Sequence, residues 1–332
     1  MTNQALACRA LFTQWGWSGE DYSPVIAAGM PRRVVRPLHE LAPRSDEILL
    51  LHYSGYAPGL ERLFEASQRG LLISHNITPP EFFWAYEPVD AVRCELAHGQ
   101  LAALAPRFGA LAGVSEYNAR QLRELSLREA AVIPVLFDLG RLGAPGAPPT
   151  GPPSILFVGR LVPHKRQDLV IAAFARYRDA QPDARLVLVG VPLSPAYGAQ
   201  LQALAQRLAP GAVTFQSAIS DAELAERYRS AHAFLCLSEH EGFCIPLLEA
   251  FHFGVPVIAR DVGAVGEVVG DAGVLLGEGD DLATVAELLR IVVGEPDLRD
   301  ELRARGRRRL EFYDHARAAG RLREALEGLG RP

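Results

Sequence analysis

The chain has 332 residues, of which 49% are hydrophobic and 22% charged, so it can bury a substantial core and is too apolar to be disordered. Its net charge of −5 argues against nucleic acid as a partner. The four cysteines lack metal-site spacing and indicate reduced thiols in the cytoplasm, and no apolar run is long enough to span a membrane. Basic charge is carried by 33 arginines and a single lysine, Lys165, which makes Lys165 a candidate functional position.

The first half of the chain predicts strands that alternate with helices. The amino terminus predicts a helix over Thr2–Trp15 and a turn over Gly19–Tyr22 that leads into a short extended segment. Apolar runs of strand length follow, separated by segments of helical periodicity, which is typical of parallel sheets. The expected strands are Glu47–Ser54, Leu71–His75, Ala110–Ser115 and Ala131–Val135, and the expected helices are Gly59–Gln68, Pro88–Ala105 and Glu116–Leu125.

The second half repeats this alternation after a segment rich in proline and glycine, residues 140–153, which predicts a linker. The expected strands are Ile155–Val158, Leu186–Val189, Val213–Phe215, Ala233–Leu237, Val255–Ala259 and Val274–Leu276. The expected helices are Asp168–Ala180, Tyr197–Leu208, Asp221–Ser230, Ile245–Phe253 and the arginine-rich stretch Pro296–Leu329. We therefore expect domains at 1–139 and 154–312, joined by the linker, and a carboxyl-terminal helix within 313–332 that packs back on the first domain.

The segment Phe157–Asp168 is the first candidate site. A strand runs into Gly159, and Arg160 and Lys165 follow at its carboxyl end, ahead of a helix. Two cations beside a helix amino terminus suit a diphosphate. The alternative is an ordinary strand-to-helix loop with surface charges, and the presence of the only lysine favours the functional interpretation.

The segment Ser238–Ala259 is the second candidate site. Glu241 and Glu249 flank Gly242–Cys244 and Pro246, and a proline there suits the first turn of a helix. The backbone N–H groups of Gly242–Cys244 would then form an anion site, while the two carboxylates suit sugar hydroxyls rather than phosphates. The alternative is a capped helix with two surface glutamates.

Several motifs between Ser154 and Leu276 resemble a known family in their order and spacing. They are VGRL followed by Lys165, then EGFCIPLLE, GVPVIA and EVVGDAGVLL. Together they resemble the retaining nucleotide-sugar glycosyltransferases of family 4. The resemblance implies an α/β chain with the GT-B fold, in which two Rossmann-like, doubly wound domains face a cleft. A strand and a glycine-bearing loop precede the first helix in that family, and neither is found here, so we expect the amino-terminal domain to lack its first strand.

The resemblance also implies roles for individual residues. Arg160 and Lys165 match the pair that binds the donor diphosphate and stabilises it as a leaving group, Glu249 matches the carboxylate that holds the ribose, and Glu241 the one that contacts the donor sugar. Further donor contacts are expected from Gly159, Gly190, Val191, Ile219, Gly242, Phe243 and Cys244. The expected catalytic residues are His75, Arg160, Lys165 and Glu241.

In the first half, His75 matches the cleft-facing histidine of the family. On its own, a histidine at a strand end is more often structural, but the loop that follows at once favours a functional role. Ser115 predicts a helix cap first and a site residue second. Together with Tyr53, Ser54 and Asn76 it is expected on the acceptor side.

The function implied by the resemblance is transfer of a hexose from a nucleoside diphosphate sugar to a saccharide or lipid-linked acceptor, with retention of configuration, no metal ion and no cofactor besides the donor substrate. A lipid-linked acceptor favours peripheral contact with the inner face of the membrane through the arginines between Arg303 and Arg309, although such a run is more often a solvated helix face. The alternative is a non-catalytic, donor-binding or scaffold member, because the first strand is expected to be absent. An oxidoreductase is disfavoured, since no G-x-G-x-x-G motif is present.

Overall fold

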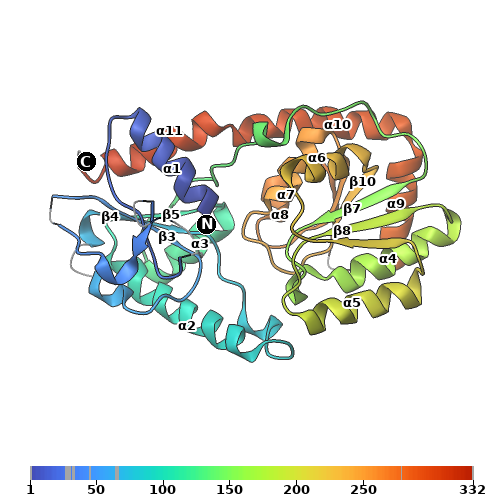
Figure 1. Ribbon diagram of the computed structural model, residues 1–332. Coiled ribbons are helices and arrows are strands. Elements are labelled where there is room, and N and C mark those ends of the chain that lie inside the picture. Colours follow the sequence, from blue (N-terminus) through green and yellow to red (C-terminus); the bar gives the residue numbers. More distant parts are fainter. Residues whose placement is uncertain are drawn as a thin grey trace. The chain divides into compact units, whose positions relative to one another are not determined.

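The computed structural model describes residues 2–26, 31, 34–44, 46–63, 67–277 and 279–330 (Figure 1). The chain divides into two compact units. Unit 1 comprises Met1–Phe137 and Asp314–Pro332, and unit 2 comprises Asp138–Tyr313. The carboxyl-terminal segment therefore belongs with the amino-terminal half of the chain, and the proline-rich segment belongs with unit 2.

Unit 1 is built on a four-stranded parallel sheet in the order β3-β4-β5-β6. These strands are β3 (Leu49–Tyr53), β4 (Gly70–Ser74), β5 (Ala110–Gly113) and β6 (Ala131–Val132). Every residue of β4 is buried, as expected for an apolar strand inside a parallel sheet. The helices are α1 (Thr2–Gln14), α2 (Pro88–Leu104), α3 (Glu116–Ser126) and α11 (His315–Glu327), and β1 (Tyr22–Ser23) pairs with β2 (Arg36–Pro37).

The helix expected over Gly59–Gln68 is wrong for the residues that the structure describes there. They form two 3-10 turns, Leu60–Leu63 and Ser67–Arg69, and residues 64–66 lie outside the description. The segment is short and bounded by Gly59 and Gly70, and a short helix has little stability of its own.

Unit 2 contains a six-stranded parallel sheet in the order β12-β11-β10-β7-β8-β9. Its strands are β7 (Ser154–Val158), β8 (Arg185–Val189), β9 (Val213–Gln216), β10 (Ala233–Cys236), β11 (Val257–Arg260) and β12 (Val274–Leu276). The chain order reverses between β7 and β10, which lie side by side. This is the doubly wound order of dinucleotide-binding folds, in which ligands bind beyond the carboxyl ends of the strands at the reversal.

The helices of unit 2 include the four that periodicity predicts between Asp168 and Phe253, with ends that differ by at most two residues. They are α4 (Gln167–Ala180), α5 (Pro195–Leu208), α6 (Asp221–Ser230), α7 (Ile245–Phe253), α8 (Val265–Val269), α9 (Leu282–Gly294) and α10 (Pro296–Leu310). The helical stretch expected over Pro296–Leu329 is divided, because a 3-10 turn at Glu311–Tyr313 separates α10 from α11. No helix in the described ranges is both long and apolar enough to cross a bilayer.

Candidate functional site

The predicted donor-binding residues follow the carboxyl ends of four neighbouring strands of unit 2. Gly159 follows β7, Gly190 and Val191 follow β8, Ile219 lies beyond β9 and Glu241 lies beyond β10. Because these strands are parallel, all four loops lie at one edge of the sheet. The loops of Lys165 and Glu241 come from β7 and β10, the two strands at the reversal.

Lys165 and Glu241 form a largely buried ion pair. The Nζ of Lys165 lies 2.5 Å from Oε1 of Glu241, and the two side chains are 16% and 7% exposed. Ser238 donates its hydroxyl to the same carboxylate oxygen at 2.7 Å. Burial alone would raise the pKa of Glu241, but the Lys165 ammonium outweighs it and holds that pKa below its ordinary value. Both groups are therefore charged at neutral pH.

Gly159 and Gly190 bring two loop backbones into close contact. A Cβ on Gly190 would lie 1.8 Å from the carbonyl oxygen of Gly159, so only glycine fits at position 190. Gly159 itself has a φ of +153°, which other residues rarely adopt. The N–H of Gly159 donates to Val189 O at 2.9 Å, which fixes the start of the loop that carries Arg160 and Lys165.

Arg160 is exposed, and in the part of the chain that the structure describes no carboxylate pairs with it. Its backbone carbonyl accepts a hydrogen bond of 2.9 Å from the buried side chain of Gln167. The backbone at Arg160 is thus anchored while the guanidinium stays available to an anion. Arg166, by contrast, is bound to Asp168 and Glu239.

The loop Gly242–Cys244 leads directly into α7. Cys244 has a left-handed backbone, with a φ of +67°, and Pro246 lies in the first turn of the helix. The side chains of Phe243 and Cys244 are 6% and 9% exposed, so these residues offer a ligand mainly their backbone. The amino terminus of α7 carries the positive end of the helix dipole.

Glu249, one turn further along α7, is 4% exposed. Its Oε1 accepts from Nη2 of Arg141 at 2.6 Å, and its Oε2 accepts from the Tyr228 hydroxyl at 2.8 Å. Arg141 also pairs with Asp221. Burial raises the pKa of Glu249 despite these two partners. No sequence motif indicates Arg141, which lies in the proline-rich segment, or Tyr228, which lies on α6.

Two thiols and a carboxylate are the one group of possible metal ligands among the described residues. The ligand atoms of Cys236, Glu241 and Cys244 lie within 4.8 Å of one another. The ammonium of Lys165 already pairs with Glu241 and would repel a divalent cation. The chemistry of this edge therefore suits an anionic ligand better than a metal ion.

In unit 1, His75 directly follows β4 and meets a second histidine. Its Nε2 lies 2.8 Å from Nδ1 of His52 on β3. Ser54 is exposed, and Asn76 has a φ of +78°, so both lie in the loops that follow these strands.

Tyr53 and Ser115 have structural roles in this unit. Tyr53 is 1% exposed, and its hydroxyl donates to Ala97 O at 2.9 Å, so it belongs to the core rather than to an acceptor-facing surface. Ser115 is completely buried and caps α3, where it accepts from Asn118 N at 3.3 Å. The expected capping role of Ser115 is thus confirmed.

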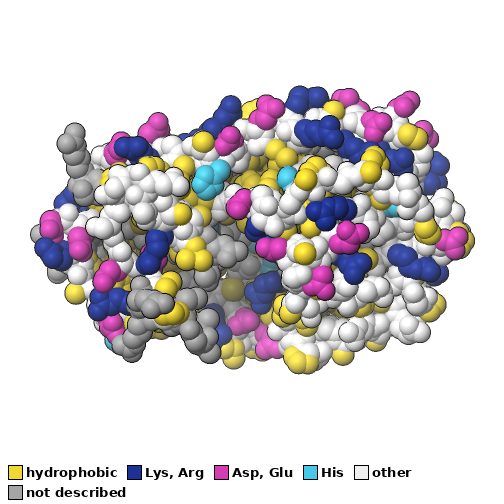
Figure 2. Space-filling view, turned by 45° about the horizontal axis from the view of Figure 1, so that its top comes forward, with side chains coloured by type: hydrophobic (Ala, Val, Ile, Leu, Met, Phe, Trp, Pro, Cys, Tyr) yellow, Lys and Arg dark blue, Asp and Glu magenta, His cyan; other side chains and the backbone are white. Residues whose placement is uncertain are grey.

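The arginine run on α10 is partly engaged within unit 2. Arg303 donates to Gly254 O at 2.9 Å, Arg305 pairs with Glu301 at 2.7 Å, and Arg309 donates to Val268 O at 3.0 Å. Basic and acidic side chains are interspersed over the face of the molecule drawn in Figure 2. Membrane contact through this run stays a prediction.

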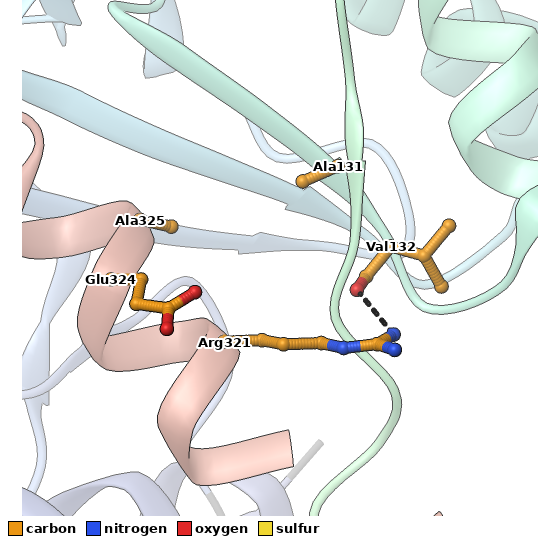
Figure 3. Close-up of a pocket in the computed structure, with 5 residues that line it drawn as sticks. All are labelled: Ala131, Val132, Arg321, Glu324 and Ala325. Carbon is orange, nitrogen blue, oxygen red and sulfur yellow. Dashed lines mark hydrogen bonds between the residues drawn. The ribbon is translucent and has the colours of Figure 1, made fainter. Parts of the chain in front are cut away.

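A pocket in unit 1 lies between β6 and α11. It is lined by Ala131, Val132, Arg321, Glu324 and Ala325, and Arg321 donates across it to Val132 O at 3.2 Å (Figure 3). It shares no residue with the predicted donor or acceptor sites. We assign it to the packing of α11.

The strand order of unit 2 and the fold of the chain belong to the GT-B structural class. The chain has a TM-score of 0.78 to sucrose-phosphate synthase from Thermosynechococcus elongatus, at 21% identity, over 98% of this chain and 92% of that one. The fold class predicted from the sequence is thereby confirmed. The family model for glycosyl transferases group 1 matches residues 144–309, so the chain belongs to that family.

Curated relatives extend this comparison. The chain is 32% identical to the D-inositol 3-phosphate glycosyltransferase of Nocardia farcinica over 68% of its own length and 51% of the relative's. It is 34% identical to a GDP-mannose-dependent monoacylated alpha-(1-6)-phosphatidylinositol monomannoside mannosyltransferase of Corynebacterium glutamicum, over 48% of this chain and 42% of that one. These matches span at most about half the length of either relative.

Proposed function

We propose that the protein transfers a hexose from a nucleoside diphosphate sugar to a saccharide or lipid-linked acceptor, with retention of anomeric configuration and without a metal ion or further cofactor. The observation that carries this proposal is the cationic edge of unit 2, where Arg160, Lys165 and the amino terminus of α7 follow strands at the reversal point. Family membership supports the reaction class. We place the reaction in the cytoplasm, peripheral to the membrane when the acceptor is a lipid.

In the proposed reaction, negative charge builds up on the diphosphate as the bond to the sugar breaks. The guanidinium of Arg160 and the N–H groups of Gly242–Cys244 would bind that charge, which lowers the barrier without a divalent ion. Lys165 has three N–H donors, and only one is needed for Glu241, so the others remain for a phosphate oxygen. Glu241 would in turn accept a hydroxyl of the donor sugar.

Glu249 would hold the ribose of the donor. Both of its oxygens already have partners, Arg141 on Oε1 and Tyr228 on Oε2. Tyr228 is completely buried and fixed by packing, whereas Arg141 is one-third exposed. A ribose hydroxyl would therefore take the Oε1 position as Arg141 moves aside. The base would lie near Val191 and Ile219.

The test is donor binding by the full chain. Nucleotide sugars with uracil or guanine bases are screened by thermal shift, because a ligand at a hundred times its Kd stabilises a protein by about 2.7 kcal/mol. Lys165→Ala and Glu249→Ala should each weaken the Kd about ten- to a hundredfold, since each removes a hydrogen bond to or from a charged group. Arg290→Ala, which removes a surface cation paired with Glu287, serves as the matched control and should leave the Kd unchanged.

Unchanged donor affinity in both site variants would show that the site is assigned wrongly. Tight donor binding without transfer to any saccharide or lipid acceptor would favour the non-catalytic alternative. His75→Ala should leave the donor Kd unchanged and lower the transfer rate, which assigns the histidine to the reaction rather than to donor binding.

A further inference from the structure

The strand register of unit 1 places two histidine side chains on one face of the sheet. His52 of β3 is aligned with Ile73 of β4, and His75 lies two residues beyond Ile73. The N–H of His75 donates to Tyr53 O at 2.8 Å, so the pairing of the two strands continues to this point. Because side chains alternate along a strand, His52 and His75 share a face, and their Nδ1 and Nε2 atoms are 2.8 Å apart.

Two residues of α1 continue the contact on the other side of His52. Cys8 is 3% exposed, and its Sγ lies 3.6 Å from Nε2 of His52. Gln4, one helical turn earlier, is 7% exposed and directs its Nε2 at the sulfur from 3.9 Å. The Oε1 of the same amide accepts the backbone N–H of Leu136 at 2.9 Å.

The side chains of Gln4, Cys8, His52 and His75 form a row of contacts. The backbone N–H of Leu136 determines in which direction hydrogen bonds are donated along this row. A backbone N–H can only donate, so the Gln4 oxygen must face Leu136 and the Gln4 NH₂ must face Cys8. The sulfur accepts from Gln4, and Nε2 of His52, 3.6 Å away, is an acceptor within reach of its own S–H. A neutral imidazole that accepts on one nitrogen carries its proton on the other.

The surroundings keep each member of the row in the required protonation state. Burial raises the pKa of the Cys8 thiol to about 12, so the thiol stays protonated at neutral pH. Burial lowers the pKa of His52 to about 4 and that of His75 well below its ordinary value, so both rings are neutral. The row therefore contains one proton for each hydrogen bond.

We infer that a one-way chain of hydrogen bonds, from Leu136 N–H through Gln4, Cys8 and His52, fixes the proton of His75 on Nδ1. His75 then accepts from His52 through Nε2, and among the described residues nothing accepts from its Nδ1–H. If the proposed function holds, the proton on Nδ1 makes His75 a hydrogen-bond donor to an oxygen of the sugar or acceptor. His75 then does not act as a general base. Gln4, Cys8 and His52 are positioning residues, which act through His75.

The tautomer of each ring is measurable without any ligand. In two-bond ¹H–¹⁵N spectra of the full chain labelled at histidine, His52 and His75 should both show a protonated Nδ1 and an unprotonated Nε2 at neutral pH. A protonated Nε2 on His75, or a mixture of both forms, would overturn the inference, whatever the activity of the protein.

Two substitutions at Cys8 separate the direction of the chain from simple packing. Cys8→Ser keeps one donor and one acceptor and should preserve both tautomers. Cys8→Ala removes the donor, so both rings should become tautomer mixtures, and kcat should fall about fivefold with the donor Kd unchanged, the effect of one ordinary hydrogen bond. A His75 tautomer that survives Cys8→Ala would contradict the chain.

The inference and the proposed function fail in different ways. Full transfer activity in His75→Ala would remove His75 from the reaction and would contradict its role as a donor to the substrate, while the tautomer spectra would still test the chain. Loss of activity in His75→Ala, together with a protonated Nε2 in the wild-type spectrum, would overturn the chain and leave the proposed function standing.

Discussion

At the scale of single residues, buried histidines make the stability of the protein depend on pH. Burial lowers the pKa of His164 to about 3 and that of His52 to about 4, whereas both titrate near 6.5 in an unfolded chain. Between pH 6.5 and pH 5 the unfolded chain therefore binds protons that the folded chain does not. The stability that the neutral histidines contribute is complete above pH 6.5 and is lost as the pH falls.

We therefore expect the free energy of unfolding to fall between pH 6.5 and pH 5, by up to about 1.4 kcal/mol per pH unit for each buried histidine. Urea denaturation at several pH values measures this slope. His164→Gln removes one titrating group from unit 2. The unfolding free energy of this variant should therefore change less steeply with pH than that of the wild type, by the contribution of one histidine. Equal slopes for the variant and the wild type would mean that His164 is protonated in the folded chain.

Also at this scale, the sequence predicts residues that belong to local motifs and misses those that reach a site from elsewhere. Lys165, Glu241 and Glu249 belong to motifs with a set spacing, and the structure brings the first two together. Arg141 contacts Glu249 across 108 positions of the chain, and Cys8 contacts His52 across 44. Contacts at such separations depend on how the elements pack, which periodicity does not report.

At the scale of elements, the close contact between the loops after β7 and β8 requires glycine at position 190, where there is no room for a side chain. In Gly190→Ala the new Cβ would meet Gly159 O at 1.8 Å, so one of the two loops must move. We expect the unfolding free energy to fall by about 3 kcal/mol, the upper end for overpacking, and donor affinity to fall with it. Both are measured by thermal denaturation with and without nucleotide.

Gly294→Ala is the control for this substitution. Gly294 ends α9 in the same unit, and a Cβ there would meet nothing within 4 Å. Its stability should match the wild type or exceed it slightly, because alanine suits a helix better than glycine. If the two variants were equally stable, the loops after β7 and β8 would not be in tight contact in solution.

Most strands and long helices of this fold are predictable because their apolar patterns are long and regular, although the 13-residue helix α9 is not among those expected. All six strands of the unit 2 sheet are expected from their apolar runs. The 3-10 turns around Glu61 and Gln68 and the five-residue helix α8 are not, since their few hydrogen bonds depend on neighbouring elements. In the first half this applies to the connection between β3 and β4, whose described residues form 3-10 turns.

At the scale of the whole molecule, unit 1 is assembled from both ends of the chain. The helix α11 follows unit 2 in sequence but packs with residues of the amino-terminal half. Leu322 and Leu326 are 1% and 3% exposed, and Arg323 lies over the ring of Trp15 at 5.6 Å. During synthesis, unit 1 can therefore be completed only after unit 2 has been translated, because α11 follows unit 2 in the sequence.

Leu322→Ala should consequently destabilise unit 1 by about 2 to 5 kcal/mol, because it leaves a cavity where a fully buried leucine stood. Hydrogen exchange monitored by mass spectrometry reads the two units separately. Amides of β3 and β4 should exchange faster in the variant, while those of β7 and β8 keep their protection, since α11 belongs to unit 1. Leu6→Ala on α1 removes a leucine that is 47% exposed and should change neither set. Faster exchange in both units would mean that they unfold together, and α11 would then stabilise the whole chain rather than unit 1.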